Sequence, residues 1–187
     1  MKFILDNGHG GMIGGVYQTK GKRGMHNGVP FYEGVYNRQI VEKLIVMCEL
    51  WDIKTYNLVP EQKDIKLSER IKREHSIYEK GDVLISIHCD AFSKESANGF
   101  TTFSYNHVNN VSKALNKSYD DANGCELRNR GCKDANFYML RKSKSKAVLI
   151  ECGFMTNFKD SQYLINHQND VVEGIFNFML NYKPQSN

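Results

Sequence analysis

The stretch Val83-Leu84-Ile85-Ser86-Ile87-His88 decides the fold class of this chain of 187 residues. It is a short apolar run rich in β-branched residues, which predicts a buried strand. Two more runs of this kind, at 3–9 and 147–151, finish in His9 and Glu151. In open α/β sheets, ligands gather in the crevice beyond the carboxyl ends of the strands. The three side chains that end these runs are therefore expected to share one site.

Strand and helix patterns alternate along the rest of the chain, which is the signature of an α/β domain. Further strands are predicted at 53–59, 99–105 and 137–140, which makes six in all. Helices are predicted from Glu33 for about eighteen residues, around 67–78, at 108–122, and from Asn157 to about Leu180. Ser68 is the predicted amino-terminal cap of the second of these helices. The segment from Gly10 to Pro30 is predicted to be a long, functional or mobile loop.

Composition narrows the class of protein. The net charge of +4 is modest, and the basic residues are spread over faces expected to be exposed, which argues against a nucleic-acid-binding module. Five cysteines without a Cys-x-x-Cys pair indicate reduced thiols rather than a disulfide framework or a structural zinc knuckle. We find no signal peptide or membrane span, and we expect a cytoplasmic origin.

Four side chains form a candidate metal and acid/base set: His9, Glu33, His88 and Glu151. A catalytic zinc site keeps three protein ligands, usually His and carboxylate, and leaves the fourth position open. Glycines on both sides of His9 let the backbone turn and present the imidazole. Glu33 shares a helix face with Asn37. Spacing does not say which glutamate binds metal and which transfers protons, because both side chains can do either.

An ordered set of motifs runs through the whole chain: Asp6-Asn7-Gly8-His9, Glu33 with Asn37, Ser86-Ile87-His88, Asn129-Arg130-Gly131, and the segment from Val148 to Asn157. Together they resemble the zinc-dependent N-acetylmuramoyl-L-alanine amidases of the type-3 amidase family, and in particular the catalytic domain of a phage endolysin. The resemblance extends from Phe3 to about Tyr182. It implies a catalytic domain at 1–182, followed by a tail or the start of a linker at 183–187.

The resemblance also implies how the site works. His9, Glu33 and His88 would bind Zn²⁺, and Glu151 would be the catalytic carboxylate. Zinc-activated water would cleave the amide between the lactyl group of N-acetylmuramic acid and the L-alanine of the stem peptide. The implied fold is a single domain with a mixed, mostly parallel six-stranded sheet flanked by helices on both faces, as in phosphorylase/hydrolase-like proteins.

Substrate contacts are expected from Asn37, Asp90 and Arg141. Asp90 departs from the family, in which Asn is common after the second His, and Arg141 follows the strand predicted at 137–140. The expected partner is bacterial peptidoglycan, with no nucleic acid and no membrane, and we expect a monomer. An endolysin-like protein would be made in the host cytoplasm and would reach the wall after membrane permeabilisation.

Two other functions remain open from the residues alone. A zinc exopeptidase would use a similar ligand set on an α/β sheet, and a catalytically silent cell-wall-binding protein would keep the fold without turnover. His26 is a rival metal ligand, although a loop histidine is expected to face solvent. Cys89 and Cys152 have no candidate base nearby in the sequence, so packing is expected of them rather than thiol catalysis.

Overall fold

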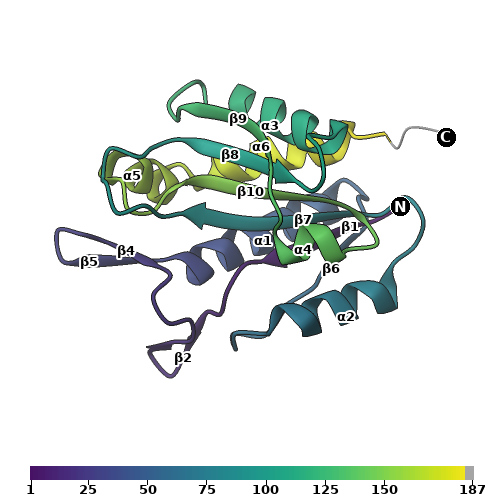
Figure 1. The fold of residues 1–187 in the computed structure, drawn as a ribbon, viewed down its shortest axis with the longest axis horizontal. Helices are drawn as coiled ribbons and strands as arrows, with labels where there is room; N and C mark the ends of the chain where they lie inside the picture. Colours follow the sequence, from purple (N-terminus) through teal and green to yellow (C-terminus); the bar gives the residue numbers. More distant parts are fainter. Residues whose placement is uncertain (184–187) are drawn as a thin grey trace.

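A six-stranded sheet runs through the middle of the computed structural model, which describes residues 1–183 (Figure 1). The strand order is β6-β1-β7-β10-β8-β9, and only the β8–β10 pair is antiparallel within this sheet. The strands are β1 (Phe3–Asn7), β6 (Thr55–Asn57), β7 (Val83–Asp90), β8 (Phe100–Ser104), β9 (Asn129–Asp134) and β10 (Lys146–Phe154). This confirms the predicted mixed, mostly parallel sheet.

Helices cover both faces of the sheet, as predicted. They are α1 (Glu33–Leu50), α2 (Leu67–Ile77), α3 (Asn110–Ala122), α4 (Tyr138–Lys142), α5 (Phe158–Asn166) and α6 (Gln168–Asn181). Helices α1, α3 and α6 lie behind the sheet in Figure 1, whereas α2 and α4 lie in front of it.

The two faces have separate apolar cores because side chains alternate along each strand. Ile85 and Ile87 of β7 belong to the large cluster on the α1, α3 and α6 face. Leu84 belongs to a smaller cluster with residues of α2 and α4. Ser86 and His88 follow Leu84 in alternation, so the polar end of β7 emerges on the α2 face. This places the predicted chemistry beside the thinner helical layer.

One of the six predicted strands was wrong. Residues 137–140 do not form a strand, because Tyr138 begins α4 and the neighbouring side chains of Met139 and Leu140 are both buried. Two consecutive buried side chains suit a helix lying on a sheet better than an alternating strand. The sixth strand is instead β9, a polar segment at the edge of the sheet.

Two predicted helix boundaries were also wrong. The last helix begins after Asn157, whose side chain caps it as expected, but the chain breaks at His167 into α5 and α6. His167 has φ −120° and ψ 38°, which is outside the helical region. Ser68 does not cap α2: the capping position is Lys66, and no side chain caps that end.

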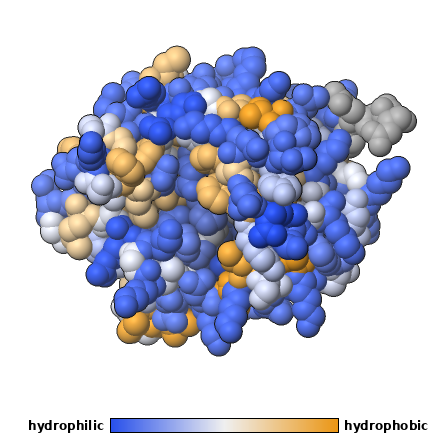
Figure 2. Space-filling view, viewed as in Figure 1, coloured by the Kyte–Doolittle hydropathy of each residue, from blue (hydrophilic) through white to orange (hydrophobic). Residues whose placement is uncertain are grey.

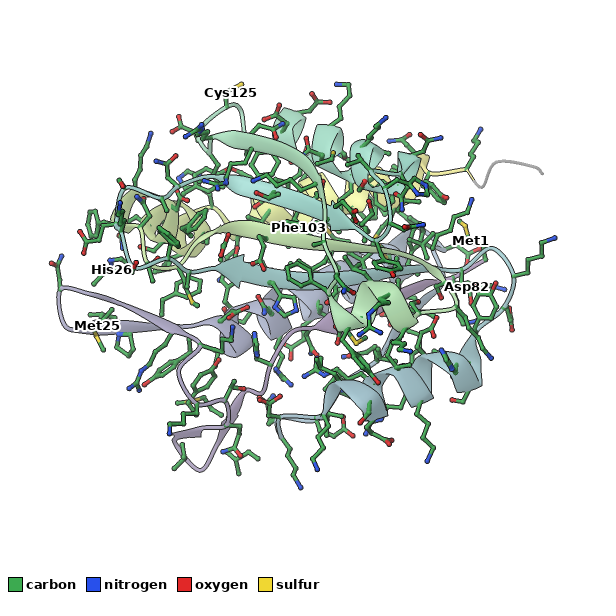
Figure 3. All side chains as sticks on the ribbon, in the orientation of Figure 1. Met1, Met25, His26, Asp82, Phe103 and Cys125 are labelled. Atoms are coloured by element: carbon green, nitrogen blue, oxygen red, sulfur yellow. The ribbon has the colours of Figure 1, made fainter. Side chains whose placement is uncertain are left out.

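The segment predicted as a long loop contains two small hairpins, β2 (Met12–Ile13) with β3 (Val16–Tyr17) and β4 (Arg23–His26) with β5 (Val29–Tyr32). Asn27 and Gly28 both have positive φ between β4 and β5, as a tight hairpin turn requires. His26 lies near the tip of this hairpin, and its Nε2 is 2.8 Å from the carbonyl oxygen of Met155 (Figure 3). The hairpin is therefore docked against the segment before α5.

Hydrophilic residues cover most of the face shown in Figure 2, and the apolar residues there form separate patches. Within residues 1–183, no helix has the length and apolar character needed to cross a lipid bilayer. Of the tail predicted at 183–187, only Lys183 lies inside the described residues.

Candidate metal centre and active site

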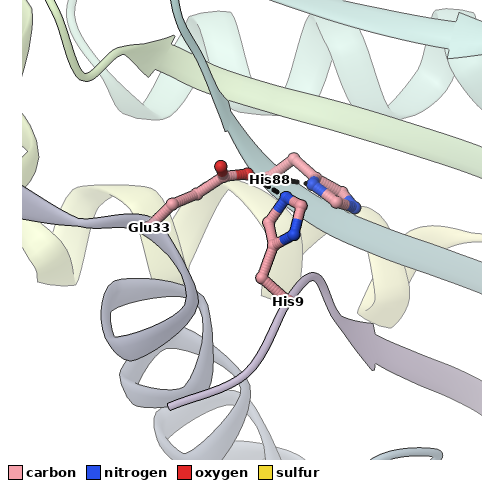
Figure 4. Close-up of side chains that lie close together, drawn as sticks. All are labelled: His9, Glu33 and His88. Carbon is pink, nitrogen blue, oxygen red and sulfur yellow. Dashed lines mark hydrogen bonds and ion pairs between the residues drawn. The ribbon is translucent and has the colours of Figure 1, made fainter. Parts of the chain in front are cut away.

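His9, Glu33 and His88 point toward one another from three different elements (Figure 4). His9 follows β1, Glu33 begins α1, and His88 lies near the end of β7. Glu33 Oε1 is 3.0 Å from His88 Nδ1 and 3.2 Å from His9 Nε2. One potential ligand atom from each side chain lies within 4.8 Å of the others. The structure thus brings together the three residues expected to bind metal.

Backbone contacts at the start of α1 hold Glu33 in the cluster. The Glu33 amide donates to the carbonyl oxygen of Lys22, and Glu33 Oε1 also accepts a hydrogen bond from the Cys89 amide at 3.2 Å. Glu33 Oε2 is buried and has no hydrogen-bond partner among the described residues. A buried carboxylate oxygen without a partner is costly unless something binds it. Glu33 Oε2 is therefore available to bind a cation.

The backbone at His9 is held in an unusual conformation. His9 has φ 70°, which non-glycine residues rarely adopt. Its carbonyl oxygen accepts hydrogen bonds from Arg38 at 2.8 Å and from Arg70 at 3.2 Å. A Cβ atom on the neighbouring Gly8 would overlap the imidazole of His88, so only glycine fits there. These contacts fix the imidazole of His9 beside that of His88.

A buried polar network lies next to the cluster and supports it. Arg70 donates to Asp6 Oδ1 at 2.6 Å and to the carbonyl oxygen of Asn7, and Ser86 donates to Asp6 Oδ2 at 2.7 Å. Burial alone would raise the pKa of Asp6, but the charge of Arg70 and the Ser86 hydrogen bond hold it below its ordinary value. The network ties together β1, β7 and α2 directly beneath the histidines.

Sequence analysis missed Arg70. Asp6 and Ser86 fall inside quoted motifs, whereas Arg70 sits in a polar helix next to Ile71 and no local pattern distinguishes it from the exposed basic residues around it. Its side chain is only 2% exposed. A buried, paired arginine of this kind is evident only once the fold brings Asp6 to it.

Glu151 lies on β10, opposite His88 in the strand register. Its Oε2 is buried without a hydrogen-bond partner among residues 1–183. Burial raises the pKa of Glu151 to about 8, although the charge of His88 acts in the opposite direction. A carboxylate whose pKa lies near neutrality is well matched to accept and return a proton. Glu151 thus differs from Glu33, whose pKa the two histidines hold at about 2 in spite of its burial.

The donor set fits a metal ion. Two imidazoles and one carboxylate form the ligand type of catalytic zinc sites. Glu33 Oε2, which is buried without a hydrogen-bond partner among the described residues, independently indicates that the cluster is suited to a positively charged ligand. The residues present therefore fit Zn²⁺. Of the two glutamates whose roles the spacing leaves open, Glu33 is the one that lies within the cluster.

The residues expected to contact substrate lie in three different settings. Asn37 is fully buried and donates to the Gly8 carbonyl oxygen at 3.1 Å, so it positions the His9 loop and does not face a substrate. Asp90 is partly exposed at the end of β7, and burial raises its pKa. Arg141 is exposed on α4, with its guanidinium 5.6 Å from the centre of the Tyr138 ring. The predicted contacts of Asp90 and Arg141 stay predictions.

The rival candidates lie outside the cluster. His26 bonds to Met155, as described above, and is therefore not a fourth member. Cys89 and Cys152 are buried, and burial raises the pKa of both thiols well above their ordinary range. A thiol of this kind is a packing residue rather than a nucleophile.

Comparison with known proteins identifies the family of this chain. Residues 3–181 match the family model described as N-acetylmuramoyl-L-alanine amidase. An uncharacterized cell wall amidase of Bacillus anthracis is 29% identical over 197 residues; the match covers 96% of this chain but only 35% of that relative. The chain thus spans about a third of the length of this relative.

Solved structures show the same fold. An N-acetylmuramoyl-L-alanine amidase from Clostridium difficile 630 superposes with a TM-score of 0.83 at 28% identity, covering 97% of this chain and 95% of that one. The catalytic domain of the CD27L endolysin, which targets Clostridia difficile, gives a TM-score of 0.74 at 24% identity, with 98% of both chains covered. The second likeness concerns the fold alone.

Proposed function

Because the chain belongs to the N-acetylmuramoyl-L-alanine amidase family, we propose that it is a peptidoglycan hydrolase. The bond cut would be the amide between the lactyl group of N-acetylmuramic acid and the L-alanine of the stem peptide. One observation carries the proposal: the His9–Glu33–His88 cluster adjoins Glu151, and each of the two glutamates has a buried oxygen without a partner among the described residues.

We infer that the cluster holds Zn²⁺ through His9, Glu33 and His88. A zinc ion bound there supplies Lewis-acid chemistry, which lowers the pKa of a water molecule and polarises the amide carbonyl. The protein's own contribution is a rigid ligand set. Arg38, Arg70 and Asn37 hold the backbone on either side of His9, and α1 holds Glu33.

Glu151 would act as the proton carrier. It accepts a proton from the attacking water and returns it to the alanine nitrogen, which then leaves as an amine. Its partial burial and unpartnered Oε2 favour this role, because a carboxylate already saturated by hydrogen bonds would be a poor base. The products are a glycan strand with a free lactyl carboxylate and a free stem peptide.

Digestion of purified peptidoglycan tests the proposal. The reaction is run with and without a chelator, and both new alanine amino termini and new reducing sugar ends are measured. We expect chelator-sensitive release of alanine amino termini without reducing ends. Release of other amino acids would indicate a peptidase instead, and binding without any cleavage would indicate a wall-binding protein.

The ligand set has its own test in the metal content of purified variants. His9→Ala and His88→Ala are expected to lose most of their zinc, whereas His26→Ala should retain it, because His26 lies outside the cluster. Unchanged zinc in both of the first two variants would refute the assigned ligands.

A further inference from the structure

A cavity opens beside the metal cluster on the side of α2, and we propose that it receives the N-acetylmuramic acid ring of the substrate. The substrate would then lie across the strand ends, with its sugar toward β1 and α2 and its stem peptide toward β10 and β8. This inference rests on the proposed amidase function and adds the direction in which the substrate binds.

The cavity is of a size suited to a small ligand and is continuous with the metal cluster. Its volume is about 380 Å³, which lies within the range of ~300–1,000 Å³ typical of ligand pockets. His9 and His88 form one wall. Ile65, Lys66 and Leu67, which lead into α2, line it as well. A group attached to an amide at the cluster can therefore enter it directly.

The lining is polar but electrically balanced. Its acidic side chains are Asp6 and Asp64, and its cations are Arg70 and Lys66. Arg70 is paired with both carboxylates, at 2.6 Å from Asp6 and 3.5 Å from Asp64. A balanced, hydrogen-bonding wall next to the apolar side chains of Ile65 and Leu67 suits the neutral hydroxyl and N-acetyl groups of a sugar. It offers less to the carboxylates of a stem peptide.

The position of Glu151 sets the direction of the substrate. Glu151 takes a proton from the attacking water and gives it to the amide nitrogen. Both of these atoms, which are bonded to the carbon under attack, must therefore be within reach of Glu151. The carbonyl oxygen would face the His9–Glu33–His88 cluster, where a bound cation would polarise it. The fourth substituent, the lactyl carbon that carries the sugar, must then point away from Glu151.

The strand order gives this direction a place in the fold. Strands β1, β7 and β10 are neighbours in that order, and they carry or lead into His9, His88 and Glu151. The side away from Glu151 is therefore the side of β1, where the cavity lies.

Charges on the opposite side fit the peptide. On this side, the guanidinium of Arg130 lies 4.9 Å from the centre of the ring of Phe154, the last residue of β10. Arg130 and Lys133 belong to β9, beyond β10 and β8. A stem peptide carries carboxylates, so it is attracted to this side of the site. The side of the cluster toward β1 and α2 thus suits the neutral sugar, and the side toward β10 and β8 suits the negatively charged stem peptide.

The experiment fills the cavity and compares two substrates. One is N-acetylmuramoyl-L-alanyl peptide, and the other is the matching D-lactoyl-L-alanyl peptide without the sugar. Leu67 is 48% exposed at the start of α2, so Leu67→Trp places an indole at the cavity without disturbing the core. Leu50→Trp, at a site 79% exposed at the end of α1, is the matched control.

We expect the wild-type protein to prefer the sugar-bearing substrate. In Leu67→Trp, the ratio of the two kcat/KM values should fall about tenfold or more, a typical effect of altered pocket shape, whereas Leu50→Trp should keep the wild-type ratio. A second readout is the binding of the disaccharide N-acetylglucosaminyl-N-acetylmuramic acid to the metal-free protein. Ligand-observed NMR measures this binding. Leu67→Trp should lose this binding, and Leu50→Trp should keep it.

Failure of the inference and failure of the proposed function look different. If the wild-type protein cleaves both substrates but Leu67→Trp leaves their ratio and the disaccharide binding unchanged, the sugar does not occupy this cavity. If the wild-type protein cleaves neither substrate, the amidase proposal fails. The NMR comparison then decides alone whether the cavity binds the sugar.

Discussion

Gly8 has no room for a side chain, because a Cβ atom there would overlap the imidazole of His88. Gly8→Ala must therefore displace His88 or the backbone. We expect weaker zinc binding and a loss of about 1–3 kcal/mol in the free energy of unfolding, the usual cost of overpacking. Zinc affinity and urea unfolding measure the two effects.

Gly14 provides the matched control for this variant. It also lies near the amino terminus, and a Cβ atom there would meet no atom within 4 Å. Its φ of 54° makes Gly14→Ala cost about 1 kcal/mol of stability, but zinc affinity should not change. Equal zinc affinity in the two variants would contradict the steric role given to Gly8.

Glu151 can be tested separately from the metal ligands. Glu151→Gln keeps the shape of the side chain but removes the base, so kcat should fall about 10²–10⁴-fold. The zinc content should match that of the wild-type protein, because Glu151 lies outside the cluster. Turnover on purified peptidoglycan and metal analysis of the same preparation check both parts. Substantial remaining turnover would remove Glu151 from its proposed role.

Asp6 is expected to link stability to pH. Its pKa is lower in the folded protein than its ordinary value, so the ionised form stabilises the fold. This contribution is complete above the ordinary pKa of about 4, and it is lost as the pH falls through the lowered value. At neutral pH, Asp6→Asn should lower the free energy of unfolding by about 3–5 kcal/mol, because it leaves Arg70 buried without its closest charge partner.

Urea unfolding at neutral pH and at about pH 3 tests the linkage. The difference between the wild-type protein and Asp6→Asn should shrink at the lower pH. Asp121→Asn is the control, since Asp121 is 64% exposed in its ion pair with Lys117 and such surface pairs contribute little. A difference for Asp6→Asn that does not depend on pH would exclude the proposed ionisation.

At the scale of elements, α2 holds the turn between α4 and β10 through Glu74. This carboxylate is fully buried and accepts hydrogen bonds from Ser143 Oγ, the Ser145 amide and Ser145 Oγ. Hydrogen bonds to a charged group contribute about 1.5–3 kcal/mol each, and leaving their donors unpaired adds to the loss. The turn lies at the start of β10, away from Glu151.

Glu74→Ala is therefore expected to lower the free energy of unfolding by about 2–4 kcal/mol, with the zinc content unchanged. Glu69→Ala, at an exposed site on the same helix, should cost far less. Chemical denaturation and metal analysis of both variants provide the measurement. Loss of zinc in Glu74→Ala would show that this turn and the metal site are coupled.

Elements with a clear hydrophobic pattern could be predicted from the sequence, and elements without one could not. The runs that became β1, β7 and β10 are almost continuously apolar, which is typical of buried parallel strands. β9 has the sequence NRGCKD and pairs with β8 alone, so neither composition nor alternation indicates a strand. The β4–β5 hairpin did have a signal, Asn27-Gly28, which favours a tight turn.

In the candidate site, too, local sequence patterns indicate some of the residues and not others. The proposed metal ligands and Glu151 stand at the ends of strands or, for Glu33, at the start of a helix, and all of them belong to motifs, so the sequence indicates them. Arg70 and the buried role of Asn37 depend on contacts between residues 29 to 64 positions apart, which no local pattern encodes.

At the scale of the whole molecule, the proposed metal site exists only in the folded chain, because its proposed ligands come from residues 9, 33 and 88. A ligand that binds only the folded state stabilises it, by about 2.7 kcal/mol when its free concentration is a hundred times its Kd. A chelator should therefore lower the Tm of the wild-type protein, and added zinc should restore it.

His26→Ala and His9→Ala separate this effect from nonspecific metal binding. The Tm of His26→Ala should respond to chelator as the wild-type protein does, whereas that of His9→Ala should not respond. Thermal unfolding followed by circular dichroism is sufficient. An equal response in all three proteins would place the stabilising metal elsewhere.

The two edges of the sheet bear on how the molecule behaves in a crowded solution. At one edge, β6 has only three residues, which is too short to serve as a template for another chain. At the other, β9 carries Arg130, Lys133 and Asp134, and Gly131 has φ 78°. Charges and an irregular backbone discourage a neighbouring molecule from adding a strand. A sheet with open edges is thereby protected from edge-to-edge aggregation at high protein concentration.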